Sequence, residues 1–294
     1  MLIGFNTLAV YKAGADVSLY SQLATKADEL GFDSMWTGHH IAFPSKIDAT
    51  YPYAANGVGP HDPRMHRIDP WTLFAHLAAQ TRRLRFGTGV YILPLVNPFV
   101  TARAVTTADA LSEGRIIFGI GVGWNAQEYA IVGEDFRNRG ERADEIIEIL
   151  KRLWTEDTIS HQGKHYPFEP LHFEPKPVQK PHPKLIYGGA SPAALQRAAR
   201  LDGCYLPVDT EDHAQALVAD LLRRRKEQGI EDPAFEVTTG VPTPLDRNAV
   251  ERFADIGVSR LLFEVGTNPL DGSDVDLTAP SLLANLERVA AAVL

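Results

Sequence analysis

Short apolar runs alternate along the chain with longer amphipathic stretches. Eight of the runs are rich in β-forming residues, and each is followed by a segment whose apolar positions recur at helical spacing. Repeated strand–helix units build a parallel sheet, and eight such units favour a closed barrel over an open doubly wound sheet. We therefore predict an α/β fold, a (β/α)8 TIM barrel formed as a single domain over residues 1–294. The predicted strands cover residues 2–6, 32–37, 85–92, 116–120, 185–187, 204–207, 235–241 and 260–265.

The helices are bounded by capping residues and glycines. Ser18 is the predicted N-cap of a helix that Gly31 stops, and Ser191 is the predicted N-cap of another whose first turn holds Pro192. Asn97-Pro98 opens a third helix, which Gly114 ends. The predicted helices cover residues 19–30, 70–81, 98–111, 141–154, 193–201, 212–228, 248–256 and 280–293.

Two long insertions interrupt the rhythm, one after the second strand and one between the fourth helix and the fifth strand. Residues 41–68 have no periodic pattern and are crowded with Pro, Gly, Asn, His and Tyr. A loop of this length within a compact domain is typical of a lid or a substrate loop. Residues 155–183 are rich in His and Pro, with a possible short hairpin around Gly163.

Composition narrows the class of protein. Of the 294 residues 45% are hydrophobic, the formal charge is -8, and lysine and arginine form no run, which argues against a nucleic-acid surface. The single cysteine, Cys204, fits a reducing compartment. No apolar run approaches the roughly 20 residues that span a bilayer, and residues 1–5 have the pattern of a strand rather than a signal peptide. We expect a cytoplasmic protein with a small-molecule substrate and no nucleic-acid or membrane partner.

Histidines and glycines gather where the predicted strands end, which is where a barrel of this type has its active site. His39 and His40 follow the second strand. Adjacent residues of an extended chain point to opposite faces, so we predict no metal site there. An imidazole can donate or accept a proton near neutral pH, although a histidine here can also merely hydrogen-bond the barrel rim. We predict a catalytic role for His40 first and His39 second.

The glycine clusters leave two interpretations open. Gly188, Gly189, Ala190 and Ser191 precede a helix, so their backbone N–H groups are predicted to bind phosphate, the alternative being an ordinary turn with an N-cap. Glycines 119, 121 and 123 lack the dinucleotide-binding spacing. They allow either a flat ring against the backbone or close packing of strands. The predicted cofactor-binding residues are Thr88, Gly89, Val90, Gly121, Val122, Gly123, Trp124, Gly188, Gly189, Ala190 and Ser191.

Taken together, these stretches resemble the bacterial luciferase-like (LLM) superfamily, in particular its coenzyme F420-dependent oxidoreductase branch. The resemblance covers roughly the first two thirds of the chain, and the last third matches only in its strand–helix rhythm. It rests on ADELGFDSMWTGHH, TRRLRFGTGVYILPLVNPFVTARAVTTADALSEGRIIFGIGVGWNAQEY, FRNRGERADEIIEILKRLW and HFEPKPVQKPHPKLIYGGASPAALQRAAR.

The resemblance implies a barrel that binds F420 or reduced FMN at its carboxyl end. It implies a cis peptide at Gly89-Val90 behind the ring, and phosphate contacts at residues 188–191 and 121–124. His39 stands where many deazaflavin enzymes have an acid, and Trp124 where the sugar-phosphate dehydrogenases have a catalytic glutamate. That dehydrogenase reaction is therefore not expected here.

Three functions remain open. The first is an F420-dependent oxidoreductase that moves a hydride between the deazaflavin and an organic substrate; the second is a reduced-FMN monooxygenase; the third is a non-catalytic flavin-binding protein. Relatives are often dimers, and the apolar outer faces of the early helices permit a homodimer. Cations of the first insertion either meet the acidic tail of F420 or form a solvated face, which we favour because exposed cations are common. These are Lys46, Arg64, His66 and Arg67.

Overall fold

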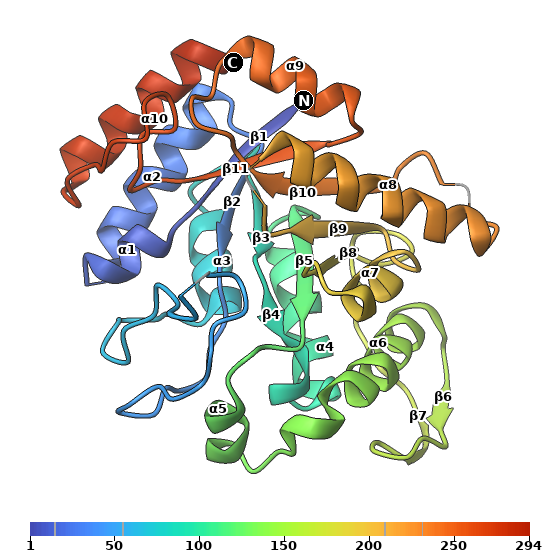
Figure 1. The fold of residues 1–294 in the computed structure, drawn as a ribbon. Helices are drawn as coiled ribbons and strands as arrows, with labels where there is room; N and C mark the ends of the chain where they lie inside the picture. The colour runs from blue at the N-terminus through green and yellow to red at the C-terminus, as the bar shows by residue number, and fades with distance from the viewer. Residues whose placement is uncertain (15, 55, 209, 231) are drawn as a thin grey trace.

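Eight parallel strands close into a barrel in the computed structural model, which describes residues 1–14, 16–54, 56–208, 210–230 and 232–294 (Figure 1). The pairings of β1 with β11 and of β3 with β5 complete the ring, so the predicted barrel is confirmed. A short strand, β4 (Tyr91–Ile92), continues the line of β3 and pairs with β5. The barrel strands are β1 (Leu2–Asn6), β2 (Ser34–Thr37), β3 (Arg85–Thr88), β5 (Ile116–Gly121), β8 (Lys184–Gly188), β9 (Gly203–Leu206), β10 (Glu236–Gly240) and β11 (Arg260–Glu264).

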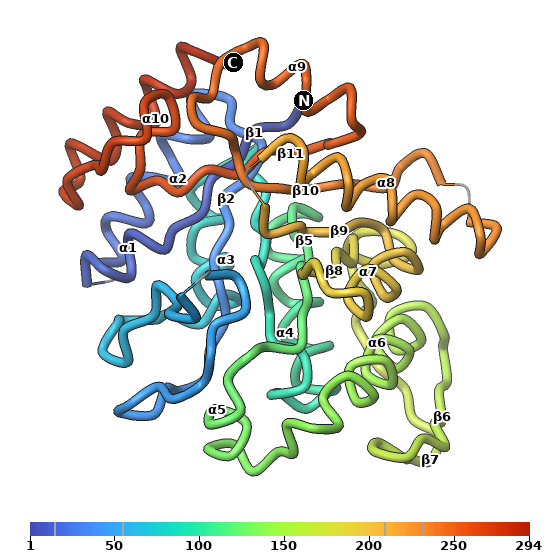
Figure 2. The backbone as a smooth tube through the Cα atoms, in the orientation of Figure 1, coloured from blue at the N-terminus to red at the C-terminus, as the bar shows by residue number. Residues whose placement is uncertain are grey.

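Helices surround the barrel, as the backbone tube in Figure 2 shows. None of those in the described part of the chain is long and apolar enough to cross a membrane. The α-helices are α1 (Leu8–Lys12), α2 (Val17–Leu30), α3 (Pro70–Ala78), α4 (Pro98–Leu111), α5 (Ala126–Ile131), α6 (Arg139–Thr155), α7 (Pro192–Ala198), α8 (Glu211–Glu227), α9 (Arg247–Asp255) and α10 (Ala279–Val293). Single 3-10 turns lie at Leu93–Leu95 and Phe136–Asn138.

The helix boundaries differ from the prediction in a few places. Ser18 is not the N-cap of α2: the carboxylate of Asp16 accepts the N–H of Ser18 at 2.9 Å, so the helix begins two residues earlier than predicted. α7 ends at Ala198 instead of residue 201. The short helix α1 has too few residues for a periodic pattern, and the sequence did not predict it. The sequence predicts helix after Trp124, where α5 begins at Ala126.

The two insertions take the forms expected of them. β6 (Ile159–His161) and β7 (Phe168–Leu171) pair antiparallel around Gly163, which confirms the hairpin. The described residues of 41–68 contain no helix or strand. Both this loop and α5 lie at the lower side of the barrel in Figure 1, and hydrogen bonds join them, since the Gln127 side chain bonds the backbone of Lys46 and of Asp48.

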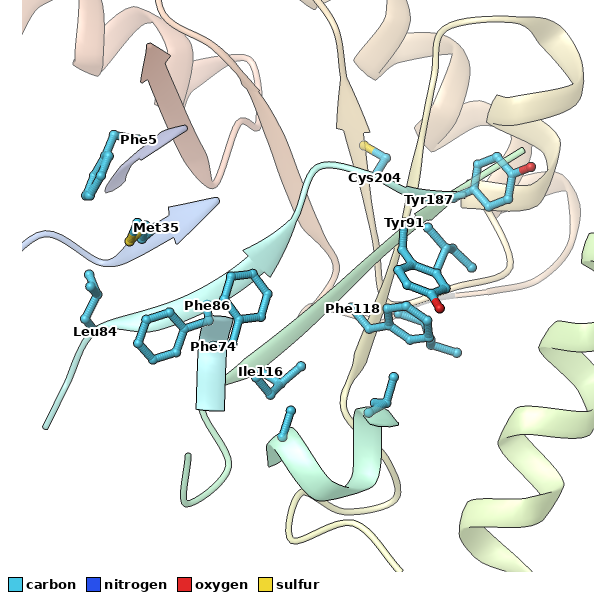
Figure 3. Close-up of a cluster of buried hydrophobic side chains, with 14 of the residues drawn as sticks. Phe5, Met35, Phe74, Leu84, Phe86, Tyr91, Ile116, Phe118, Tyr187 and Cys204 are labelled. Carbon is cyan, nitrogen blue, oxygen red and sulfur yellow. The ribbon is translucent and has the colours of Figure 1, made fainter. Parts of the chain in front are cut away.

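The strands bury side chains on both faces. Outward-facing residues pack against the helices; Figure 3 shows Phe5, Met35, Phe86, Ile116 and Phe118 among them, all fully buried. Residues of the opposite parity point into the barrel and form a separate cluster of Trp36, Ile117, Ile186 and Leu262, with Tyr205 packed against it. The barrel is therefore filled with side chains below its carboxyl end, as its strand number requires.

A buried ion-pair network lies inside the barrel at the amino ends of the strands. Arg260 is fully buried, and its guanidinium contacts the carboxylates of Asp33 at 2.7 Å and Glu236 at 2.9 Å. Burial alone would raise the pKa of Asp33, but the positive charges of Arg260 and Arg85 outweigh it and hold the pKa below its usual range. Both carboxylates are therefore ionised partners of Arg260.

Removing the central cation should be costly. We expect Arg260→Met to lower the free energy of unfolding by about 3–5 kcal/mol, because two buried carboxylates lose their shared partner. Urea unfolding at neutral pH measures the difference. Arg200→Met is the control, since Arg200 is exposed on the barrel exterior and surface substitutions usually change stability by less than about 0.5 kcal/mol. Equal losses in the two variants would contradict the network's role.

Candidate active site at the carboxyl ends of the strands

A backbone bulge separates β3 from β4 at the mouth of the barrel. The peptide between Gly89 and Val90 is cis, at the position that the family resemblance implies. A Cβ atom added to Gly89 would lie 3.4 Å from the rings of both Trp36 and Tyr205. The bulge is therefore supported from below by the aromatic side chains that fill the barrel.

Neighbouring glycines make room for the bulge. A Cβ on Gly119 would lie 1.9 Å from the carbonyl oxygen of Thr88, and one on Gly188 would lie 2.3 Å from a methyl carbon of Val90. The same side chain of Val90 would lie 2.7 Å from a Cβ on Gly121. Of the two interpretations of these glycines, the structure favours close packing: their missing side chains accommodate residues 88–90 of the neighbouring strand.

His40 forms a buried pair with a carboxylate that the sequence analysis missed. Its Nδ1 lies 2.8 Å from Oε2 of Glu128 in the first turn of α5, and the two side chains are 11% and 1% exposed. The other carboxylate oxygen accepts the backbone N–H of Ile41 at 2.7 Å. A carboxylate oxygen accepts hydrogen bonds, so Nδ1–H of His40 donates to Glu128 and Nε2 is left as the other nitrogen of the ring.

His39 faces the other way and contacts the bulge. Its backbone N–H donates to the carbonyl of Val90 at 3.2 Å, and its Nδ1 accepts the N–H of Ile92 at 3.3 Å. The ring stacks on Tyr91 with centroids 4.0 Å apart. Burial, with a smaller contribution from the neighbouring His40, lowers the pKa of His39 to about 3. His39 is thus a neutral side chain that fastens the end of β2 to β4.

Aromatic residues of the 41–68 loop pack beside His40. Phe43 lies 4.5 Å from the His40 ring, and His61 lies 5.2 Å from it. His61 also stacks on Trp124 at 5.6 Å, and Tyr51 contacts Trp124 edge-on at 5.2 Å. Burial foremost, then the nearby His40 and Arg67, lowers the pKa of His61 to about 3. The loop therefore joins the predicted catalytic histidine to the turn after β5.

The turn after β8 also meets this loop. Gly189 has φ +128°, and a Cβ there would lie 3.2 Å from the hydroxyl of Tyr53. The N–H of Gly189 donates to Tyr205, whereas those of Ala190 and Ser191 have no hydrogen-bond partner among the described residues. Ser191 caps α7, accepting the N–H of Ala194 at 3.2 Å. Ser191 is therefore the predicted N-cap of α7, and the N–H groups of Ala190 and Ser191 remain available to a ligand.

One cation of the loop is not solvated, which corrects the interpretation of all four as an exposed face. Lys46, Arg64 and His66 are exposed as predicted, but the guanidinium of Arg67 lies over the ring of Phe43 at 4.4 Å. The prediction of a solvated side chain is wrong for Arg67, because its aromatic neighbours shield part of it from water.

Glu264 is a second acid that the sequence analysis missed. It ends β11 beside Asn6 at the mouth, and its carboxylate accepts the N–H of Leu8 at 3.2 Å and of Ala9 at 2.9 Å. Burial raises its pKa to about 7, although these backbone N–H groups oppose the shift. In the sequence it is a lone acid after an apolar run, with no spacing to distinguish it from a solvated strand end.

The raised pKa of Glu264 predicts an effect of pH on stability. The folded state keeps a proton on Glu264 that the unfolded chain releases, so the contribution of Glu264 to the free energy of unfolding should fall as pH rises from about 4.5 to about 7. The shift corresponds to about 3 kcal/mol. His39 and His61, whose pKa values are lowered, make stability rise with pH over much of the same range, so the test is the difference between two proteins. Urea unfolding should show the stability of the wild type falling relative to that of Glu264→Gln as pH rises from about 4.5 to about 7. Parallel curves for the two proteins would contradict a protonated Glu264.

The structure therefore brings the predicted residues to one end of the barrel. The bulge, His40 and the turns after β5 and β8 meet around the 41–68 loop, while His39 packs behind the bulge. A single sequence signal marked Glu128: Asn125 and Glu128 have the spacing of a capping box, which suggests a role at the helix end only.

Comparison with known proteins identifies the family of this chain. A family model described as luciferase-like monooxygenase matches residues 4–263. The chain belongs to the luciferase-like monooxygenase family. An uncharacterised protein of Mycobacterium tuberculosis is 34% identical to it over 85% of this chain and 86% of its own length.

Two relatives of this chain are named for different cofactors. An F420-dependent glucose-6-phosphate dehydrogenase of Amycolatopsis mediterranei is 30% identical over 71% of this chain and 58% of its own. An FMNH2-dependent dimethylsulfone monooxygenase of Pseudomonas putida is 34% identical over 46% of this chain and 38% of its own. Membership of the family is therefore compatible with either F420 or FMN as the cofactor.

Solved structures support the fold. Monooxygenase RslO1 from Streptomyces bottropensis has a TM-score of 0.77 at 21% identity, covering 99% of this chain and 98% of that one. An F420-dependent secondary alcohol dehydrogenase, solved with an F420–acetone adduct, has a TM-score of 0.75 at 14% identity with the same coverage. At these identities the similarity concerns the fold alone.

Proposed function

We propose that this luciferase-like protein is an F420-dependent oxidoreductase acting on a small organic substrate. The observation that carries the proposal is the buried His40–Glu128 pair at the mouth of the barrel, close to the turn after β5. When bound, F420 would supply the hydride chemistry. The contribution of the protein is to hold the ring and the substrate and to move a proton.

In this proposal His40 transfers the proton through Nε2. Glu128 holds Nδ1–H, fixes the tautomer of the neutral ring and stabilises the charged ring when Nε2 is protonated. Because Glu128 also accepts the N–H groups of Ile41 and Ala42, it positions the backbone that follows His40. The pair can therefore act as a general acid or base according to the direction of the reaction.

The bulge and the two turns would hold the cofactor. Residues 88–90 would present their backbone to a flat ring, and Val122 and Trp124 in the turn after β5 would contact it as predicted. The unpaired N–H groups of Ala190 and Ser191 suit a phosphate because they are small-residue donors with no competing partner among the described residues. The residues present thus fit a ring that carries a phosphate side chain.

The second candidate is a reduced-FMN monooxygenase, which the 34% identity to the Pseudomonas putida enzyme favours. The same backbone donors serve the phosphate of either cofactor. A non-catalytic cofactor carrier is the third candidate, but a carrier needs no proton-transfer pair of the kind that His40 and Glu128 form.

Titration of the apoprotein with F420 and with FMN tests the proposal. We expect F420 to bind at least about 10-fold more tightly than FMN, and the holoprotein to oxidise or reduce a member of a panel of carbonyls, enones and alcohols. Micromolar FMN binding without F420 binding would reverse the order of the first two functions. Tight binding without turnover of any compound would favour the carrier.

A further inference from the structure

Arg67 is half-buried, and its guanidinium is a cation without an acidic partner. Its Nη2 lies 3.0 Å from Nδ1 of His61 and 3.7 Å from the sulfur of Met65, and its plane lies over Phe43 at 4.4 Å and near Tyr11 at 5.5 Å. In the described part of the chain, no carboxylate forms an ion pair with it, and its Nε and Nη1 are buried without a hydrogen-bond partner.

The positive charge of Arg67 is not neutralised by any group that contacts it among the described residues. Burial lowers the pKa of Arg67, and the nearby charges of Glu128 and Asp62 oppose that shift only through space. The low pKa of His61 keeps that ring neutral, so its Nδ1 accepts a hydrogen bond from Arg67 but does not neutralise the charge. A half-buried cation with unpaired N–H groups is stabilised by an anion that binds beside it.

Arg67 lies on the same side of the mouth as the proton-transfer pair. Phe43 links the two groups, since its ring contacts both the guanidinium and His40. Tyr11 approaches from the β1 side, where its hydroxyl donates to the carbonyl of Gly38 at 3.1 Å. The amides of residues 190 and 191 follow β8, and β3 and β5 lie between β2 and β8 in the barrel. The two sets of anion donors therefore follow different strands.

We propose that Arg67 binds an oxyanion of the substrate, so that this protein acts on organic acids, with the acid group held beside His40. This inference rests on the proposed function, because it places the substrate on the His40 side of the mouth and leaves the amides after β8 to the cofactor. Arg67 is the specificity-determining residue, and its partner is a carboxylate or another planar oxyanion, which matches the donor geometry of a guanidinium.

The binding test needs no cofactor and no knowledge of the substrate. The apoprotein is titrated with benzoate and with benzamide, which share a shape and differ in charge. Binding is followed by the intrinsic tryptophan fluorescence and by the ¹⁵N signal of the Arg67 Nε–H group. We expect the wild-type protein to prefer benzoate by at least 10-fold and the Arg67 signal to shift on binding. Equal affinity for both compounds, or no shift, would overturn the proposal without recourse to any variant.

A pair of variants separates the charge of Arg67 from its packing. Arg67→Met should abolish the preference for benzoate, whereas Arg64→Met should retain it, because Arg64 lies in the same loop but is exposed. An unchanged preference in Arg67→Met would assign the residue to loop packing and overturn the proposal.

A further arm distinguishes a substrate anion from a cofactor anion. FMN and riboflavin differ by the phosphate, and F420 and its tail-less deazaflavin differ by the phosphate and the acidic tail. Arg67→Met should leave the preference for the longer member of each pair unchanged. Loss of that preference, with benzoate binding intact, would assign Arg67 to the cofactor and overturn the inference. F420 affinity is measured separately from benzoate affinity. A protein that does not bind F420 would contradict the proposed function, whereas a protein that does not prefer benzoate would contradict the role of Arg67.

Discussion

Replacing His40 with alanine should lower turnover by about 10²- to 10⁴-fold, the usual contribution of a positioned acid–base group. The affinity for F420 should change far less, because the predicted ring and phosphate contacts come from backbone atoms of other segments. Glu128→Gln should have a smaller effect in the same direction, since an amide can still accept from Nδ1–H but cannot stabilise the charged ring. Steady-state kinetics and cofactor titration on each variant measure both quantities.

His66→Ala is the matched control for His40→Ala. His66 belongs to the same region but is exposed, and its Nδ1 contacts only the carbonyl of Gly14 at 2.9 Å in the described structure. This variant should retain full turnover. If His40→Ala keeps wild-type turnover, His40 has no part in the reaction; if cofactor binding falls as steeply as turnover, its role is in binding instead.

Gly119→Ala should disrupt the bulge from a neighbouring strand. The new methyl group would lie 1.9 Å from the carbonyl oxygen of Thr88, a backbone atom that a rotamer change cannot move aside. The Thr88 hydroxyl also donates to the carbonyl of Gly119 at 2.7 Å, so both strands must shift together. We expect a loss of about 3 kcal/mol in unfolding free energy and cofactor affinity weakened by at least about 10-fold.

Gly38→Ala provides the comparison for that substitution. An added Cβ on Gly38 meets no atom within 4 Å, although the residue lies at the mouth, next to His39. Its stability and cofactor affinity should remain near those of the wild type. Wild-type behaviour of Gly119→Ala would mean that residues 88–90 can move without consequence for the site.

The barrel could be predicted from the sequence because strand and helix patterns repeat eight times. The strands are short runs of β-forming residues and the long helices have one apolar face, so local patterns determine both element type and order. Boundaries were less certain where two caps compete: Asp16 and Ser18 are both good N-caps, and only the backbone geometry selects Asp16.

The chemistry of the mouth was only partly predictable. His40 was found because it follows a strand directly, whereas its partner Glu128 is 88 positions away and has an equally good local role as a capping residue. The burial of Arg67 depends on how an irregular loop folds over Phe43 and Tyr11, and no periodicity encodes that. The glycines after the strands were identified as a cluster, but their contacts with Val90 and Thr88 depend on strand register.

A crystal structure of the protein with F420 would show whether the mouth of the barrel holds the cofactor as proposed. We expect the deazaflavin ring to lie against the backbone of residues 88–90 and the phosphate to bind the amides of Ala190 and Ser191. Nε2 of His40 should face the reactive side of the ring. A ring bound elsewhere, or a phosphate held by Arg67 instead of those amides, would contradict it.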